Sequence, residues 1–535
     1  MFQAVIQNED SFDPYIFHYA PRVHYVEWVD RDLRSYSFGG RIIDPRNGEI
    51  LKGHVRIGAL RLREDILLAA AFLSPFASFS NATSADLVDN GCSCCYDGLK
   101  SLLGEDVLQA VLQRVKVLGA HEVGHALGLA HNFAGSSYRD GFASVMDYPP
   151  PLLQWDEAAQ RIVLNNRSYA NDVGFFDKVS IDYGYRNFKN EASIKEGKLT
   201  QELYDIIADA EKKGYVFLTD EDADISGSDW RASRWNSGVN PIFGLSNSLK
   251  IRKYALKQLS EKAIAPFSPI SQIRQIFSVV YLFHRYEVEA CAKLLGGVSY
   301  QYSMKSDVYN RVSEVVDAAN QTAALHQLIA TLHPEQLSVS SNLQSLLSTP
   351  PAFGFEQSDI GGPDDLLYSR TGANFDMIAA YETAAEVVIS AVFNTKRLER
   401  LAAQSLANSS QLSLGKVLET FTDHFIVQPF QNYDRIENSL AEVMAVQSVL
   451  VNRYLVIISE SGDLKSCMQP PSALVLGQVE FHLKQIENHL TKVDFSSAGS
   501  NALWRSWDMF RLFLLSAIDA KRPFLALRTP SEAPI

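Results

Sequence analysis

Three histidines and one glutamate occur within residues 119–147, GAHEVGHALGLAHNFAGSSYRDGFASVMD, at spacings that suit a metal site. In a helix, residues four apart lie one turn above each other, so His121 and His125 would present two imidazole nitrogens about 6 Å apart. Glu122 stands about 100° around the helix from His121, near enough to reach a water on the metal without becoming a ligand. The spacing predicts a chelating pair with a general base beside it.

A third ligand follows if the helix ends between His125 and His131. Gly128 lies there, and glycine accepts the left-handed conformation that returns the chain toward the metal. Three neutral histidines leave a fourth coordination position for water, which is typical of a catalytic rather than a structural zinc site. Zinc lowers the pKa of such a water to about 7, so that Glu122 can take its proton while the water attacks a carbonyl group.

Chance is a poor explanation of this pattern. The motif His-Glu-x-x-His arises at random in a chain of this length with a likelihood on the order of one in a hundred. If Gly128 and His131 are also required at their fixed offsets, the same arithmetic lowers that likelihood by a further factor of roughly several hundred. We therefore interpret the histidines as ligands rather than as core or surface residues.

The full pattern His-Glu-x-x-His-x-x-Gly-x-x-His, in residues 121–131, resembles the signature of the metzincin zinc proteases. In that clan a turn with a methionine under the metal follows the zinc helix, and residues 144–148, SVMDY, resemble this Met-turn, with Met146 as its methionine. In astacin-like and serralysin-like members a tyrosine two residues past the methionine alternates between binding zinc and stabilising the tetrahedral intermediate. Tyr148 occupies the matching position, and packing beneath the proline run 149–151 is the alternative interpretation.

Within the clan the chain is most similar to a mostly bacterial group of large zinc-dependent metalloproteases known mainly through domains of unknown function. Seven segments carry this likeness: residues 25–29 (YVEWV), 44–50 (DPRNGEI), 131–133 (HNF), 145–149 (VMDYP), 182–185 (DYGY), 217–220 (FLTD) and 284–286 (HRY). Members of the group usually have a signal peptide and a few hundred residues ahead of this point. The resemblance thus implies a catalytic domain truncated at its N-terminus relative to the family, and an exported, periplasmic or extracellular location.

The resemblance implies an α+β fold. A metzincin-like catalytic domain at residues 1–245, with a twisted mixed sheet, a zinc helix and a Met-turn, would be followed by a mainly α-helical region at residues 246–535. The strand at residues 37–43 would be the edge of the sheet above the zinc helix, where an extended substrate adds a strand.

The residue pattern itself predicts several elements. Alternating residues 22–29 and two apolar arms around the turn at residues 44–48 indicate strands and a hairpin within residues 22–58. A short helix at residues 63–73 and a helical run at residues 104–130 follow, whereas residues 151–244 show little regular periodicity. Long helical patterns then occupy residues 272–295, 306–332, 375–406, 433–459 and 473–490.

Composition limits the partners. With 49 basic and 62 acidic residues, the chain carries a formal net charge of −13, so its surface would repel phosphate backbones and we expect no nucleic-acid partner. The longest apolar run near the start, residues 66–73, is far shorter than the roughly 20 residues of a membrane span, and no span is predicted. The start of the chain also lacks the basic and apolar regions of a secretory signal. Oligomeric state has no readable signal.

Two other groups invite a metal interpretation. Cys92, Cys94 and Cys95 form a Cys-x-Cys-Cys cluster, which without a second cysteine pair nearby is more typical of a loop with thiols or one local disulfide. The acidic run at residues 220–224, DEDAD, is a candidate Ca²⁺ site, although a solvated loop is the commoner outcome for such a run.

The sequence therefore predicts a zinc-dependent endopeptidase, a metallopeptidase that hydrolyses peptide bonds by a zinc-bound water activated by Glu122. One Zn²⁺ would be held by His121, His125 and His131, with a peptide or protein as substrate. Two alternatives stay open: a catalytically silent metzincin scaffold that only binds, and a zinc hydrolase of a non-peptide amide or ester. The presence of Glu122 disfavours the silent scaffold.

Overall fold

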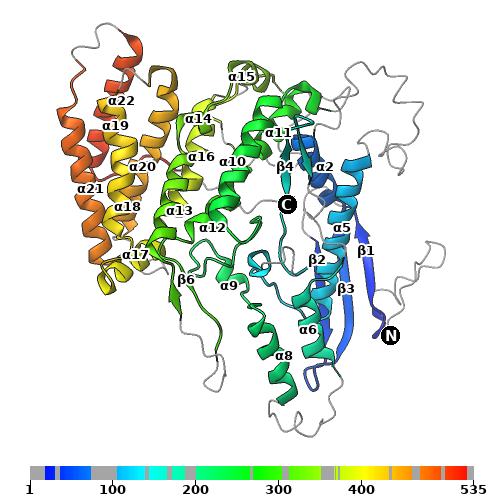
Figure 1. The fold of residues 1–535 in the computed structure, drawn as a ribbon. Helices are drawn as coiled ribbons and strands as arrows, with labels where there is room; N and C mark the ends of the chain where they lie inside the picture. Colours follow the sequence, from blue (N-terminus) through cyan, green and yellow to red (C-terminus); the bar gives the residue numbers. More distant parts are fainter. Residues whose placement is uncertain are drawn as a thin grey trace, which may run out of the picture.

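The structure is a computed structural model that describes most of the chain. The described residues are 19–30, 37–73, 105–138, 144–164, 172–186, 201–264, 269–303, 313–350, 367, 369–371, 374–432, 436–460, 470–495 and 501–526. The predicted cysteine cluster at residues 92–95 lies outside these ranges. Figure 1 shows a helical mass formed by the second half of the chain, with a narrow sheet and one long helix on its flank.

The first sheet has three strands in the order β1-β3-β2. Strand β1 (Tyr25–Val29) runs parallel to β3 (Ile50–Gly58), whereas β2 (Phe38–Ile43) pairs antiparallel with β3. The hairpin turn is closed by the Asp44 carboxylate, which accepts the Arg46 amide at 3.0 Å, and by Gly48 at φ 77°. The predicted hairpin and mixed sheet are thus confirmed, and β2 is an edge strand.

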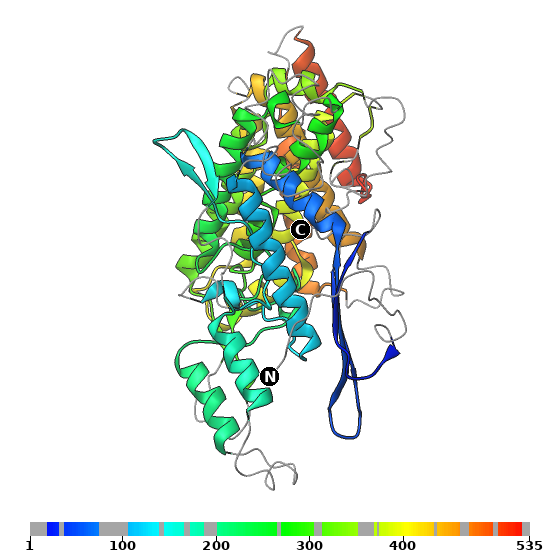
Figure 2. The ribbon, with the colours of Figure 1, turned by 90° about the vertical axis from the view of Figure 1, so that its right-hand side faces the viewer.

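The long helix α5 (Glu105–Ala126) packs against this sheet and against α2 (Ala59–Leu73), as Figure 2 shows from the side. Val55, Ile57 and Leu118 form the apolar contact between sheet and helix. Strand β2 approaches closely because Gly39 has no side chain: a Cβ there would lie 2.1 Å from the Glu122 carbonyl oxygen. The sheet edge is therefore held directly against the residue predicted to be the general base.

Helix α5 ends four residues before the predicted limit of the helical run. Gly128 adopts φ 102°, and the Leu129 amide donates to the Gly124 carbonyl at 2.9 Å, which closes a Schellman-type end. Alanine and leucine continue the apolar pattern to residue 130, so periodicity alone does not show where the helix stops. The predicted turn at Gly128 is confirmed.

Residues 144–223 contain more regular structure than their sequence suggested. Strands β4 (Leu153–Asp156) and β5 (Arg161–Leu164) form an antiparallel hairpin. Helices α6 (Phe175–Tyr185) and α8 (Gln201–Lys212) pack side by side beyond the C-terminal end of α5, and the single-turn α9 (Asp220–Ala223) follows. The expectation of little regular periodicity missed α8 although its 12 residues make about three turns, whereas the four-residue strands and the single-turn α9 are too short to establish a period.

Although the run predicted as one helix at residues 306–332 begins only at Ala318, after a short strand at residues 314–315 and the N-cap Asp317, the rest of the chain is mainly helical, as predicted. Its elements are α10 (Pro241–Gln258), α11 (Ile273–Tyr281), α12 (Arg285–Ala292), β6 (Val298–Ser299), β7 (Glu314–Val315), α13 (Ala318–Thr331), α14 (Pro334–Leu337), α15 (Ser341–Leu347), α16 (Met377–Val392), α17 (Thr395–Ala407), α18 (Leu414–Thr422), α19 (Gln428–Gln431), α20 (Leu440–Glu460), α21 (Ala473–Lys492) and α22 (Ala502–Asp519). Two runs predicted as single helices, 272–295 and 375–406, are each broken into two. The second break falls at Asn394, the N-cap of α17, in a residue type that favours helix starts.

One hydrophobic core extends through the helical region and reaches the first half of the chain. Phe72 of α2 and Leu153 and Ile162 of the β4-β5 hairpin belong to the same buried cluster as the helices from α10 onward. The division of the chain at residue 245 stays a prediction, but the elements on either side of it share this core.

Within the described residues, one helix is long and apolar enough to cross a membrane. It spans Glu437–Ser459, and 67% of its most apolar window is buried inside the protein. It packs against α16, α21 and α22, as a core helix does.

Candidate metal centre

The three predicted histidine ligands meet at one point. His125 Nε2 lies 3.0 Å from His121 Nε2 and 3.1 Å from His131 Nε2. A zinc ion with ligand bonds of about 2.0–2.1 Å in tetrahedral geometry would separate such nitrogens by roughly 3.3 Å. Among the described residues, these histidines are the one group of three or more histidine, cysteine or carboxylate side chains arranged to hold a metal ion.

The opposite ring nitrogens fix how each imidazole is protonated. His121 Nδ1 lies 2.6 Å from the Val145 carbonyl oxygen, and His125 Nδ1 lies 3.0 Å from that of Leu129. His131 Nδ1 lies 2.9 and 3.0 Å from the two carboxylate oxygens of Asp220. Because an oxygen of this kind can only accept, each Nδ1 carries a proton in the neutral ring, and each Nε2 directs a lone pair at the other two.

This arrangement suits a cation. The lone pair of His125 Nε2, 3.0 and 3.1 Å from the other two nitrogens, is repelled by their lone pairs unless an electropositive atom lies between them. Burial lowers the pKa of His121 to about 3, with His125 as the next cause, and burial also lowers the pKa of His125. Both rings are therefore neutral near pH 7, which is the form that binds metals. The residues present fit a zinc ion held by three histidines.

The turn beneath the histidines is fixed by hydrogen bonds. Asp177 of α6 accepts the Ser144 hydroxyl at 2.7 Å and the Val145 amide at 2.8 Å, while the Met146 carbonyl accepts the Asn132 amide at 3.0 Å. Met146 is 2% exposed and lies against Gly124 of α5, where a Cβ would be 2.4 Å from its sulfur. The turn thus presses on the helix between the first two histidines.

Tyr148 reaches the histidines from the same turn. Its hydroxyl lies 2.9 Å from His131 Nε2, and its ring stacks on Trp235 with centroids 4.8 Å apart. The Trp235 amide donates to the Tyr148 carbonyl at 3.2 Å, and Trp235 holds an unusual positive φ of 61°. Trp235 therefore adopts a costly backbone conformation at the point where it contacts Tyr148.

A family model described as Met-zincin matches residues 105–431. The chain belongs to the Met-zincin family. The match begins at the first residue of α5 and ends in α19, so it extends far beyond the histidines into the helical region. A search of curated proteins and a search of solved structures return no match.

The Met-zincin assignment confirms the resemblance drawn from the sequence and supports metal binding by the histidine group. Glu122 follows His121 on α5 and is 5% exposed. Arg41 of β2 donates to the His125 carbonyl at 2.7 Å, next to the turn at Gly128. The edge strand therefore contacts the metal helix at both Glu122 and His125.

Sequence reasoning missed three residues that support this Met-zincin centre: Asp177, Asp220 and Trp235. Only Asp220 left a signal, since Thr219 and Asp222 form a capping box that predicts a helix start there. The predicted Ca²⁺ site at residues 220–224 stays untested. Its carboxylates have other partners, since Asp222 accepts the Thr219 amide at 2.8 Å and Asp224 accepts the Ser226 amide at 2.8 Å.

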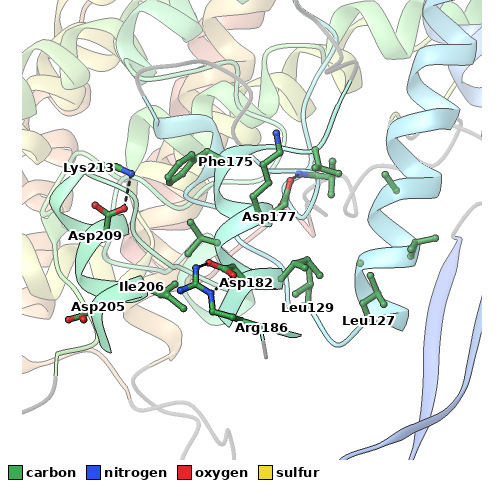
Figure 3. A pocket seen from close by; sticks show the side chains of 18 of the residues that line it. Leu127, Leu129, Phe175, Asp177, Asp182, Arg186, Asp205, Ile206, Asp209 and Lys213 are labelled. Atoms are coloured by element: carbon green, nitrogen blue, oxygen red, sulfur yellow. Dashed lines mark hydrogen bonds and ion pairs between the residues drawn. The ribbon is translucent and has the colours of Figure 1, made fainter. Parts of the chain in front are cut away.

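A cavity of about 920 Å³ lies behind this centre, between α5, α6 and α8 (Figure 3). Ala120 and Val123 line it from α5, about 260° and 200° around the helix from His121, so it opens on a different face from the histidines. Asp177 and Val145 form part of its wall and connect it to the Met-turn. Its charged rim is largely paired internally, as in the contacts Arg186–Asp182 and Lys213–Asp209 drawn in Figure 3.

Proposed function

We propose that this Met-zincin is a zinc-dependent endopeptidase, with His121, His125 and His131 as the zinc ligands. The observation that carries the proposal is the convergence of three Nε2 atoms, each turned inward by a hydrogen bond at Nδ1, beside Glu122. When bound, zinc would polarise a substrate carbonyl and lower the pKa of the attacking water. The remaining chemistry belongs to side chains of the chain itself.

Glu122 would act first as general base and then as general acid. It would take a proton from the attacking water and deliver it to the leaving amine, a role that typically contributes about 10²- to 10⁴-fold in rate. Its burial at 5% exposure keeps bulk water away from the carboxylate. Met146 would act as the packed floor under the ligands, and Gly128 as the turn that brings His131 back.

Tyr148 would stabilise the negative oxygen that develops on the substrate carbonyl. Its hydroxyl is already within hydrogen-bonding distance of a ligand nitrogen, at 2.9 Å from His131 Nε2, so it stands at the edge of the reaction centre. Stacking on Trp235 restricts the ring and reduces the reorganisation needed at the moment of reaction.

A peptide substrate would bind along the free edge of β2. Among the described residues this strand has a partner on one side only, and it contacts α5 at Glu122 through Gly39. Backbone hydrogen bonds to an added strand would bind many sequences and place a scissile carbonyl near the histidines. This mode of binding suits an endopeptidase better than a hydrolase of small amides or esters.

The test compares the wild-type chain with Glu122→Gln, which keeps the shape of the side chain and removes its basicity. Zinc content is measured by elemental analysis, and cleavage by mass spectrometry of a peptide-library digest. We expect about one zinc in both chains and cleavage by the wild type only. Zinc without cleavage of any peptide by the wild type would support the silent scaffold, and cleavage restricted to small esters or amides would support the non-peptide hydrolase.

A further inference from the structure

His131 differs from the other two histidines in what supports it. Backbone carbonyls accept from Nδ1 of His121 and His125, whereas a carboxylate, that of Asp220, faces Nδ1 of His131. Both carboxylate oxygens lie at nearly equal distances, 2.9 and 3.0 Å. A carboxylate on the outer nitrogen of a metal-binding histidine fixes the ring orientation and makes the inner nitrogen a stronger donor.

Backbone pairing explains how Asp220 comes within reach of a histidine 89 positions earlier. The Phe133 amide donates to the Leu218 carbonyl at 2.8 Å, and the Leu218 amide donates to the Asn132 side-chain oxygen at 3.2 Å. These bonds place the residues after His131 beside those before Asp220. Thr219, the N-cap of α9, then directs Asp220 at the first position of the helix toward the imidazole.

Side chains from the helical region hold in place the residues that follow Asp220. Lys293, the C-cap of α12, is 1% exposed, and its amino group donates to the Asp222 carbonyl at 3.0 Å and the Ala232 carbonyl at 2.5 Å. Arg400 of α17 donates to the Ser226 carbonyl at 3.0 Å. Two basic side chains that are distant in sequence therefore fix the backbone on the C-terminal side of Asp220.

A cation of this anchored segment faces Asp220. Arg234 lies 3.6 Å from the carboxylate, and its guanidinium covers the ring of Phe133 with a centroid distance of 5.3 Å. The Asp220 side chain is 52% exposed, so solvent screens its charge. Its contribution is therefore mainly geometric: it holds the ring of His131 in one orientation and one tautomer.

We propose that Asp220 is a positioning residue for the third metal ligand, acting through the Nδ1–H of His131. The proposal rests on the proposed function in one respect, namely that the three histidines bind zinc. Partners of this kind typically change metal affinity by about 10- to 100-fold when they are removed. The helical region would then support the metal centre, because Lys293 and Arg400 hold the segment that carries Asp220.

The test measures zinc affinity of the full chain by competition with a chelator. Asp220→Ala removes the acceptor, Asp220→Asn keeps a neutral acceptor, and Glu221→Gln is the matched control, since Glu221 is exposed on the next position of the same helix. We expect affinity to fall about 10- to 100-fold in Asp220→Ala, less in Asp220→Asn, and less than about twofold in Glu221→Gln.

A second readout reports the tautomer directly. The ¹⁵N shifts of the His131 ring, assigned with His131→Gln, should show the Nδ1–H form in the metal-free wild type and a mixture in Asp220→Ala, at unchanged thermal stability. Wild-type affinity in Asp220→Ala, or an equal loss in Glu221→Gln, would overturn the proposal. Zinc binding by a wild-type chain that cuts no peptide would overturn the peptidase alone, and absence of zinc affinity in the wild type would overturn both.

Discussion

The contact between Gly124 and Met146 gives a sharp test of the Met-turn. Replacement by alanine would place a Cβ 2.4 Å from the Met146 sulfur, well inside van der Waals contact. Gly119 lies on the same helix, where an added Cβ would meet only Ile57, at 3.8 Å. Gly124→Ala and Gly119→Ala therefore make the same chemical change on one helix with opposite steric consequences.

Two effects compete at these positions. Alanine favours a helix over glycine by up to about 1 kcal/mol, and at Gly119 nothing opposes this gain. At Gly124, forcing a methyl group into a packed core costs about 1–3 kcal/mol, and Met146 has little room to move because it is 2% exposed. We expect Gly119→Ala to stabilise the metal-free chain by up to about 1 kcal/mol, and Gly124→Ala to destabilise it by up to about 2 kcal/mol.

Denaturant unfolding of the metal-free variants measures both changes in the free energy of unfolding. Zinc affinity gives an independent reading, since a displaced Met146 would move the neighbouring Val145 carbonyl, which accepts from His121 Nδ1 at 2.6 Å. We expect weaker zinc binding in Gly124→Ala and wild-type binding in Gly119→Ala. Equal stability and equal zinc affinity in the two variants would refute the view that the Met-turn packs tightly under the metal helix.

Three further changes have expected outcomes. Tyr148→Phe should lower kcat for peptide cleavage by about 100-fold and leave zinc affinity within a fewfold of wild type, measured by steady-state kinetics and chelator competition. Burial raises the pKa of Glu287 from 4.5 to about 7, so the folded state binds more protons than the unfolded state in that window and stability falls as pH rises through it. Glu287→Gln should remove this loss, so that its stability relative to wild type grows by up to about 3 kcal/mol between pH 4.5 and 8, measured by denaturant unfolding across that range. Removal of metal with a chelator should lower Tm, and zinc at about 100 times its Kd should restore about 2.7 kcal/mol, measured by calorimetry.

Local pattern was enough to predict the centre of the site. His121, Glu122 and His125 follow from helical spacing, and Gly128 follows from the conformation that a helix end requires, which its φ of 102° confirms. The β2-β3 hairpin was predictable for the same reason, because turn residues lie between two apolar arms. Each of these features depends on residues within a few positions of one another.

The support around the centre was not predictable in this way. Asp177 holds the Met-turn from 32 positions away, and Asp220 faces His131 from 89 positions away. Asp177 is not distinguished from other aspartates by its neighbours in sequence, and the capping pattern beside Asp220 predicts a helix start but no contact with His131. Their roles arise from tertiary pairing, and for Asp220 from backbone hydrogen bonds between residues near 133 and 218.

The acidic run 220–224 shows how local structure decides between two readings of the same residues. A Ca²⁺ site needs several oxygens directed at one point. Within α9, however, Asp222 lies about 200° around the axis from Asp220 and turns to the Thr219 amide and the Tyr302 hydroxyl, at 2.8 Å each. Convergence of Asp220 and Asp222 on one calcium ion would require this helical turn to unwind, which would withdraw Asp220 from His131. The capping box that starts α9 thus favours support of the histidine centre over a calcium site, because both uses need the same carboxylate in incompatible orientations.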